Sequence, residues 1–229
     1  MIAWRDESRR HMTRAGKFGI LVSTALLIGL LVYASPSQTL NDADSYAVYS
    51  ALMNSETHGK ADKGLWMLSA STTVYEAAHA CAPNLTANDD QSVFDLTTSP
   101  QASIHVPPED KVRFREVLDD FEKNCHERGS LRADLLKTDW PVRMLTAQEE
   151  KQYKNDLAPE NPEPLKKWPH NAAGLQSFSR VFFNHDHTLA MVYSSFYCGM
   201  LCATWEWKVL ERTNSGWVVL PWKIDTMVS

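Results

Sequence analysis

The feature that most constrains this chain is an uncharged apolar segment near its amino terminus. Residues 18–34 read FGILVSTALLIGLLVYA, a run of 17 residues without a charged side chain. A helix needs about 17–25 such residues to cross the roughly 30 Å hydrocarbon core of a bilayer. A helix buried in a soluble core would not normally be uncharged on every side beside a basic flank. The segment therefore predicts a transmembrane helix.

The charges on either side of the segment predict its orientation. Residues 1–17 carry five basic side chains against Asp6 and Glu7, whereas Asp42 and Asp44 follow the segment. Because Lys and Arg are retained on the cytoplasmic side, we expect the amino terminus in the cytoplasm and the body beyond the membrane. The expected organisation is a basic cytoplasmic tail (1–17), a transmembrane signal anchor (18–34), a linker (35–41) and an envelope-facing domain (42–229).

A second interpretation of the segment stays open. Val32-Tyr33-Ala34 suits the site of a signal peptidase, so the segment would be a signal peptide removed after Ala34. A start at Met12 instead of Met1 would favour cleavage, because MTRAGK is a short basic leader. Both interpretations place the body in the same oxidising compartment.

The net charge of −5 divides unevenly between the tail and the rest of the chain. Residues 1–17 contribute +3, so the remainder carries −8. Binding to nucleic acid needs a basic face that neutralises phosphates, which an acidic body does not supply, so we expect no nucleic-acid partner. The 44% apolar content is too high for a disordered chain, and the length after the segment suits one domain.

The cysteines fit an exported body, because all of them follow the apolar segment. An even number of cysteines in an oxidising compartment favours disulfides, and three pairings are possible. The spacing Cys-x-x-x-Cys is one residue longer than that of redox dithiols, and a zinc site would need a second close pair. The disulfide candidates are Cys198 with Cys202, which closes a five-residue loop, and then Cys81 with Cys125.

The hydrophobic pattern predicts an α+β fold, with helices first and strands later. Residues 109–128 have the clearest helical spacing, and Thr146 with Glu149 has the spacing of a capping box. From residue 176 the pattern changes to period two with turn signals between the runs. We expect helices packed on a four-stranded antiparallel carboxy-terminal meander. The expected helices are 42–58, 109–128 and 146–157; the expected strands are 65–75, 178–183, 188–197, 204–211 and 217–222.

Few residue groups suggest chemistry. His185-Asp186-His187 has two metal-binding side chains, but it lies in a turn, where residues i and i+2 generally do not point the same way. Ser194-Ser195 lies in a strand, which places one hydroxyl on each face. Because neither group has the further residues that its chemistry needs, we expect no catalytic residue, no metal and no cofactor.

Aromatic residues mark a possible binding surface. Glu206 lies between Trp205 and Trp207, and Trp168 lies beside a proline. Aromatic side chains in such positions either cap the core or line a contact surface, and they stack well on sugars. The possible binding surface is therefore Trp205, Glu206, Trp207 and Trp168, and a carboxylate mechanism through Glu206 stays open.

The carboxy-terminal third resembles a family of uncharacterised bacterial exported or membrane-anchored proteins. The resemblance rests on FSRVFFN (178–184), LAMVYSS (189–195), CGMLC (198–202) and GWVVL (216–220). It covers about half of the chain. It implies one compact α+β domain and a bacterial source, and it implies no activity and no site. The location that follows is the bacterial inner membrane, with the body in the periplasm.

These observations lead to two hypotheses of different classes. The first is a non-catalytic binding module, of an inhibitor or immunity type, that recognises an envelope protein. The alternative is an envelope hydrolase that acts on cell-wall material through Glu206 and a histidine. A thiol-redox role for Cys198 and Cys202 is a further hypothesis. The oligomeric state is not indicated by the sequence.

Overall fold

The computed structural model describes residues 38–39, 42–57, 64–73, 99–157, 168–199 and 202–228. All of them belong to Ser37–Ser229, one of two compact units into which the chain divides; the other is Met1–Pro36. The expected tail at 1–17 and membrane segment at 18–34 lie outside the described residues. Within the described ranges, no helix is both long enough and apolar enough to cross a membrane.

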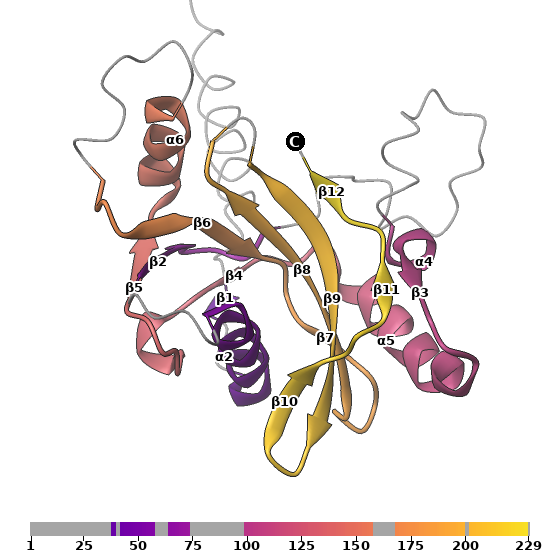
Figure 1. The fold of residues 1–229 in the computed structure, drawn as a ribbon. Helices are drawn as coiled ribbons and strands as arrows, with labels where there is room; N and C mark the ends of the chain where they lie inside the picture. Colours follow the sequence, from indigo (N-terminus) through magenta and orange to yellow (C-terminus); the bar gives the residue numbers. More distant parts are fainter. Residues whose placement is uncertain are drawn as a thin grey trace, which may run out of the picture. The chain divides into compact units, whose positions relative to one another are not determined.

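The described part is an α+β structure that contains one large sheet (Figure 1). Its helical elements are α2 (Ala43–Thr57), α4 (Pro100–Ser103), η1 (Pro108–Asp110), α5 (Lys111–Asn124), η2 (Ala133–Leu135) and α6 (Ala147–Asp156). Its strands are β1 (Gln38–Thr39), β2 (Leu65–Ser69), β3 (Ile104–His105), β4 (Gly129–Ser130), β5 (Val142–Leu145), β6 (Ala172–Phe178), β7 (Phe182–Phe183), β8 (Leu189–Tyr197), β9 (Thr204–Thr213), β10 (Gly216–Val219), β11 (Lys223–Ile224) and β12 (Met227–Val228).

The large sheet has eight strands and is mixed. Its path runs β10-β9-β8-β6-β2-β5, with β7 beside β8 and β12 beside β9. Neighbours from β6 to β10 pair antiparallel, whereas β2 runs parallel to both β5 and β6. The four-stranded antiparallel meander is therefore not confirmed. A tight turn signals an antiparallel neighbour in the sequence, but β2 and β5 join the sheet through connections that leave no such local signal.

The first expected strand of the meander, 178–183, is also displaced. β6 ends at Phe178, and pairing with β8 resumes only at β7. In the interruption, the Ser179 N–H donates to the Tyr193 carbonyl at 2.9 Å, and the Ser179 hydroxyl accepts from the Tyr193 N–H at 2.9 Å. A side-chain hydroxyl thus replaces a main-chain acceptor, which strand propensity alone does not reveal.

Two helices follow their local sequence signals closely. The apolar stripe of α5 is buried, at Phe114, Val117, Leu118 and Phe121. The capping box at the start of α6 is present: the Glu149 N–H donates to Thr146 Oγ1 at 3.3 Å, and the Thr146 N–H donates to Glu149 Oε2 at 2.9 Å. Such caps satisfy N–H groups that a helix start leaves without partners.

The helix α2 packs on one face of the sheet. Tyr49 stacks on Phe178 with ring centroids 5.1 Å apart, and its hydroxyl donates to the Ser179 carbonyl at 2.8 Å. Burial raises the pKa of the Tyr49 phenol well above its usual range. Ala190 and Val192 of β8 join the same cluster, as expected for alternate residues on one face.

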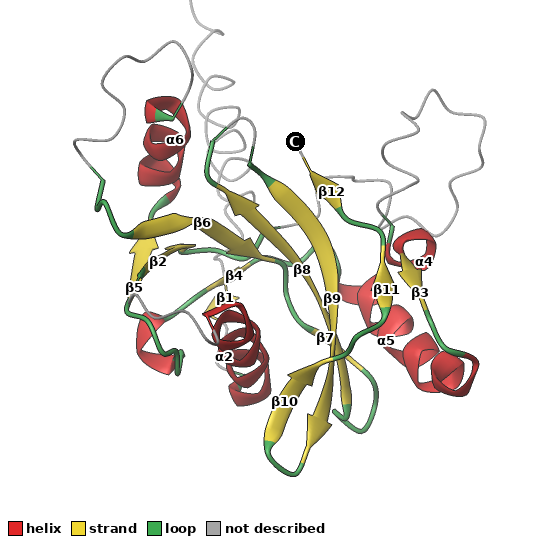
Figure 2. Cartoon of the chain, viewed as in Figure 1, coloured by secondary structure: helices red, strands yellow, loops and turns green. Residues whose placement is uncertain are grey.

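The helices α5 and α6 lie at separate places along the sheet (Figure 2). Each packs on the face opposite to α2, in its own hydrophobic cluster. The α5 cluster holds Phe121 together with Met191 and Val209 of the sheet. The α6 cluster holds Tyr153 together with Met67, Leu145 and Leu175. The two clusters share one face of the sheet and leave a stretch of that face between them.

Candidate functional site

Two of the four tryptophan and glutamate residues proposed from the sequence lie in the core. Trp207 is 1% exposed and contacts Phe121 edge to face, with ring centroids 5.4 Å apart. Trp168 is 7% exposed, contacts the Tyr153 ring at 5.0 Å and donates its indole N–H to Asp156 at 3.0 Å. Both side chains therefore serve packing, and Trp205 and Glu206 are the members of this set with more accessible side chains.

Trp205 and Glu206 are both half-buried, but they lie on opposite faces of β9. Trp205 is the cross-strand partner of Ser195, and Glu206 is the partner of Ser194. Cross-strand partners share a face and successive residues alternate, so one ligand on one face does not contact both.

The carboxylate of Glu206 is occupied by neighbours on its own face. It accepts from the Lys208 ammonium at 2.7 Å and from the Thr226 hydroxyl at 3.3 Å. Among the described residues, no histidine contacts this carboxylate. The hydrolase hypothesis through Glu206 therefore gains no specific support from this geometry.

On the Trp205 face, three serines from neighbouring strands form a line that we call the serine row: Ser69, Ser177 and Ser195. Ser177 of β6 and Ser195 of β8 are direct cross-strand partners. Ser69 of β2 lies beside Ser177, because the preceding residues Leu68 and Gln176 are paired. Trp205 of β9 is the next residue on this face, between Ser195 of β8 and Met227 of β12.

The serine row separates the two hydrophobic clusters on this face. Along β8, Ser195 lies between Tyr193, which packs on the α5 cluster, and Tyr197, which packs on the α6 cluster. Along β9, Trp205 is followed on the same face by Trp207 of the α5 cluster. The row is therefore a polar line between two apolar regions, and Trp205 is the aromatic side chain at its end.

The hydroxyls of the row differ in their hydrogen bonding. Ser69 Oγ lies 2.5 Å from Glu150 Oε1 of α6 and 2.8 Å from the Ser71 carbonyl oxygen. Ser177 is only 7% exposed, yet its hydroxyl bonds to none of the described residues, and neither does that of half-buried Ser195. Neither hydroxyl is among the fully buried side-chain atoms without a partner, which in the described part of the chain are Trp66 Nε1, Gln176 Oε1 and Arg180 Nε. Both hydroxyls therefore reach the surface, where they can donate to and accept from a ligand.

Few charged groups contact the serine row in the described part of the chain. Burial raises the pKa of Tyr193 to about 12, so this neighbour is neutral at physiological pH. Glu150 supplies the one charged side chain that hydrogen-bonds to the row within the described part of the chain. The row is thus a neutral, hydroxyl-rich line with an acidic group at the end opposite Trp205.

The other serine of the Ser194-Ser195 pair serves a different purpose. Ser194 is buried on the α2 face, where its hydroxyl accepts from Gln176 Nε2 at 2.6 Å. The Gln176 Oε1 atom is buried and has no partner among the described residues. The two hydroxyls therefore lie on opposite faces, as the alternation of the strand predicts.

The two histidines of the 184–187 turn contact different partners. His187 has a φ of 52°, stacks on Phe183 at 4.4 Å, and its Nδ1 lies 3.0 Å from Asp44 Oδ2. His185 is exposed, and its Nδ1 lies 3.6 Å from Glu116 Oε2. No group of three or more metal-ligating residues occurs within the described ranges. The turn thus contacts α2 through His187 and Asp44, and α5 through His185 and Glu116.

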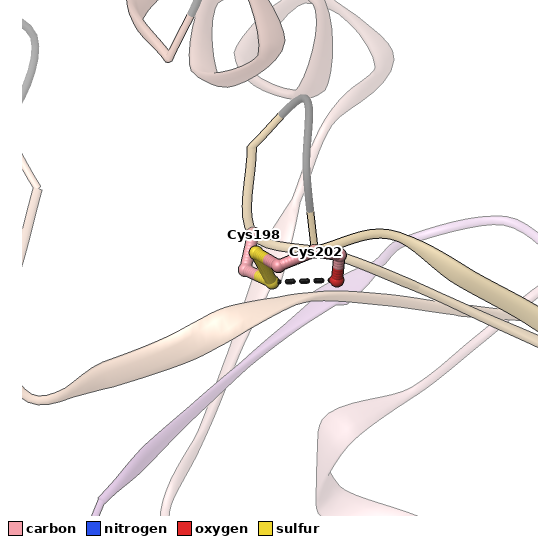
Figure 3. The surroundings of a disulfide bond; sticks show 2 residues. All are labelled: Cys198 and Cys202. Carbon is pink, nitrogen blue, oxygen red and sulfur yellow. Dashed lines mark hydrogen bonds between the residues drawn. A yellow bond between two sulfur atoms is a disulfide. The ribbon is translucent and has the colours of Figure 1, made fainter. Parts of the chain in front are cut away.

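Cys198 and Cys202 form a disulfide at the end of the β8–β9 hairpin, as Figure 3 shows. Their Cα atoms are 5.5 Å apart, and Cys198 Sγ lies 2.7 Å from the Cys202 carbonyl oxygen. The bond ties together the strands that carry Ser195 and Trp205. Cys125 is also disulfide-bonded, but Cys81 lies outside the described residues, so their pairing stays a prediction.

Sequence reasoning missed the serine row. Its members come from three strands, and Ser69 is more than a hundred residues before Ser177. A lone serine in a strand is usually a filler of the polar face. Only the parallel pairing of β2 with β6, which the sequence does not indicate, brings the three together.

Comparisons with family models, with curated proteins and with solved structures produced no match for this chain.

Proposed function

We propose that this protein is a membrane-anchored binding module of the bacterial cell envelope, which holds a ligand without converting it. The observation that carries the proposal is the half-buried Trp205, next to Ser195 and then Ser177, whose hydroxyls bond to none of the described residues. Aromatic side chains in partly desolvated positions are typical anchors of binding surfaces.

The construction of this surface favours binding. All of its side chains lie on strands of the large sheet, which hold them more accurately than loops do. The Cys198–Cys202 bond further restrains the hairpin end next to Ser195 and Trp205. A rigid surface loses little conformational entropy when a ligand binds, so its contacts contribute more fully to affinity.

The location is part of the same proposal. Residues 18–34 anchor the chain in the inner membrane, the tail at 1–17 stays in the cytoplasm, and the body faces the periplasm. Disulfides persist in that compartment, in agreement with the bond between Cys198 and Cys202. A reporter enzyme that is active only outside the cytoplasm, fused after Ser229, is expected to be active. An inactive fusion would contradict the location.

Site-specific photo-crosslinking in bacterial cells tests the binding surface. The photoreactive aromatic amino acid benzoylphenylalanine, which keeps a ring for ligand contact, replaces Trp205 in one full-length variant and Val218 in a control. Val218 is 48% exposed, so random collisions would label position 218 at least as well as position 205. We expect a discrete adduct from position 205 alone, because only that side chain belongs to the surface. Equal labelling at both positions, or no adduct at position 205, would contradict the proposal.

A further inference from the structure

We infer that Trp205 and the serine row bind a neutral oligosaccharide. The inference rests on the proposed function and names the ligand class of the same surface. It starts from the two side-chain hydroxyls of Ser177 and Ser195, which bond to none of the described residues although Ser177 is more than nine-tenths buried.

The hydrogen-bonding capacity of the row matches a sugar. Each serine hydroxyl both donates and accepts, which is also the capacity of every sugar hydroxyl. A peptide backbone instead presents separate N–H donors and C=O acceptors, for which an unpaired strand edge is the better match. The hydroxyls of Ser177 and Ser195 belong to side chains on the sheet face, not to an edge.

Trp205 supplies the other half of sugar recognition. A sugar ring has an apolar C–H face as well as a polar rim, and a tryptophan ring offers a large flat surface for that face. Here the aromatic ring and the hydroxyls lie side by side, because Trp205 is the direct cross-strand partner of Ser195. A pyranose over Trp205 therefore has its rim within reach of the serine row.

The length and charge of the row narrow the ligand further. Ser69 is only 3% exposed and its hydroxyl is already bonded, so the sugar contacts Trp205, Ser195 and Ser177. These three residues cross two strand spacings, or about 10 Å, which suits a short oligosaccharide better than a monosaccharide. Glu150 hydrogen-bonds to Ser69 at the far end. A carboxylate accepts strongly from neutral hydroxyls and repels anionic groups. We therefore assign neutral glycans and exclude uronic-acid chains.

Calorimetric titration of the full-length chain in detergent micelles tests the inference. The probes are the neutral chitotetraose and maltotetraose, with tetragalacturonic acid as the anionic probe. We expect at least one neutral probe to bind and the anionic probe to bind at least about tenfold more weakly. The double variant Ser177→Ala/Ser195→Ala is expected to lose about tenfold or more in affinity, because each lost hydrogen bond costs a few-fold. Trp205→Ala should lose a similar factor.

The controls separate binding from folding. Ser215→Ala removes an exposed hydroxyl in the β9–β10 turn and is expected to leave sugar affinity unchanged. Unfolding midpoints of all variants are measured in parallel, and the serine variants should stay close to the parent because no described residue loses a hydrogen bond.

Three results would overturn the inference. The first is that neither neutral probe binds at concentrations up to about 5 mM. The second is that the anionic probe binds more tightly than the neutral probes. The third is that the double serine variant binds the neutral probe with unchanged affinity. If the photo-crosslink from position 205 then goes to a protein, the ligand class is wrong while the proposed function stands. If position 205 also gives no adduct, both fail.

Discussion

Replacement of Trp207 by alanine is expected to lower the free energy of unfolding by about 3–5 kcal/mol. Trp207 is 1% exposed and contacts Phe121 at 5.4 Å and Tyr193 at 5.0 Å between ring centroids. Removal of its indole leaves a cavity in the α5 cluster that rigid strands and a helix cannot fill. Denaturant unfolding of the full-length chain in a mild detergent, followed by circular dichroism, measures the loss.

The neighbouring tryptophan provides the matched control. Trp205 lies on the same face of the same strand, two residues away, but is half-buried. Trp205→Ala should cost about 1 kcal/mol, because much of its surface is already in water. Equal losses for the two variants would show that both tryptophans serve the core, and the binding surface would then lose its aromatic anchor.

Replacement of Gly174 by alanine is expected to cost about 2–5 kcal/mol, the second large effect. Gly174 has a φ of +144°, which side chains rarely adopt. A Cβ atom there would lie 2.5 Å from the Phe196 ring and 2.9 Å from the Tyr197 carbonyl oxygen. Backbone strain of about 1–2 kcal/mol and overpacking of about 1–3 kcal/mol both contribute. The same unfolding assay measures the change.

Gly216→Ala separates the two contributions. Gly216 also has a positive φ, +117°, but a Cβ atom there would meet nothing within 4 Å. Only the strain remains, so the expected loss is about 1–2 kcal/mol. If Gly216→Ala proves as costly as Gly174→Ala, the close approach of Phe196 to β6 is not what fixes the pairing of β6 with β8.

The sequence revealed most where structure depends on near neighbours. The apolar spacing of α5 and the capping box at Thr146 are local signals, and both are present. The alternation of a strand places Trp205 and Trp207 on one face of β9. It did not reveal that Trp207 packs against Phe121 of α5 while Trp205 stays half-buried, because that difference depends on where a distant helix lies.

Pairings between strands that lie far apart in the sequence could not be predicted from local sequence patterns. The parallel neighbours of β2 extend the sheet past the expected meander, and they bring Ser69 beside Ser177. Nothing near either residue signals this contact. The candidate site is therefore predicted only in part from the sequence: Trp205 belongs to the expected binding surface, Ser195 is expected to have no catalytic role, and Ser69 and Ser177 give no signal.

The central claim is that Trp205, and not its buried neighbour, contacts the ligand. Fluorine NMR of the full-length chain labelled with 5-fluorotryptophan tests it most directly, with resonances assigned from single Trp→Phe variants. On addition of a neutral tetrasaccharide, we predict that the Trp205 resonance shifts or broadens while that of Trp207 stays in place. An unchanged Trp205 resonance, with a shift at another tryptophan or at none, would contradict the account.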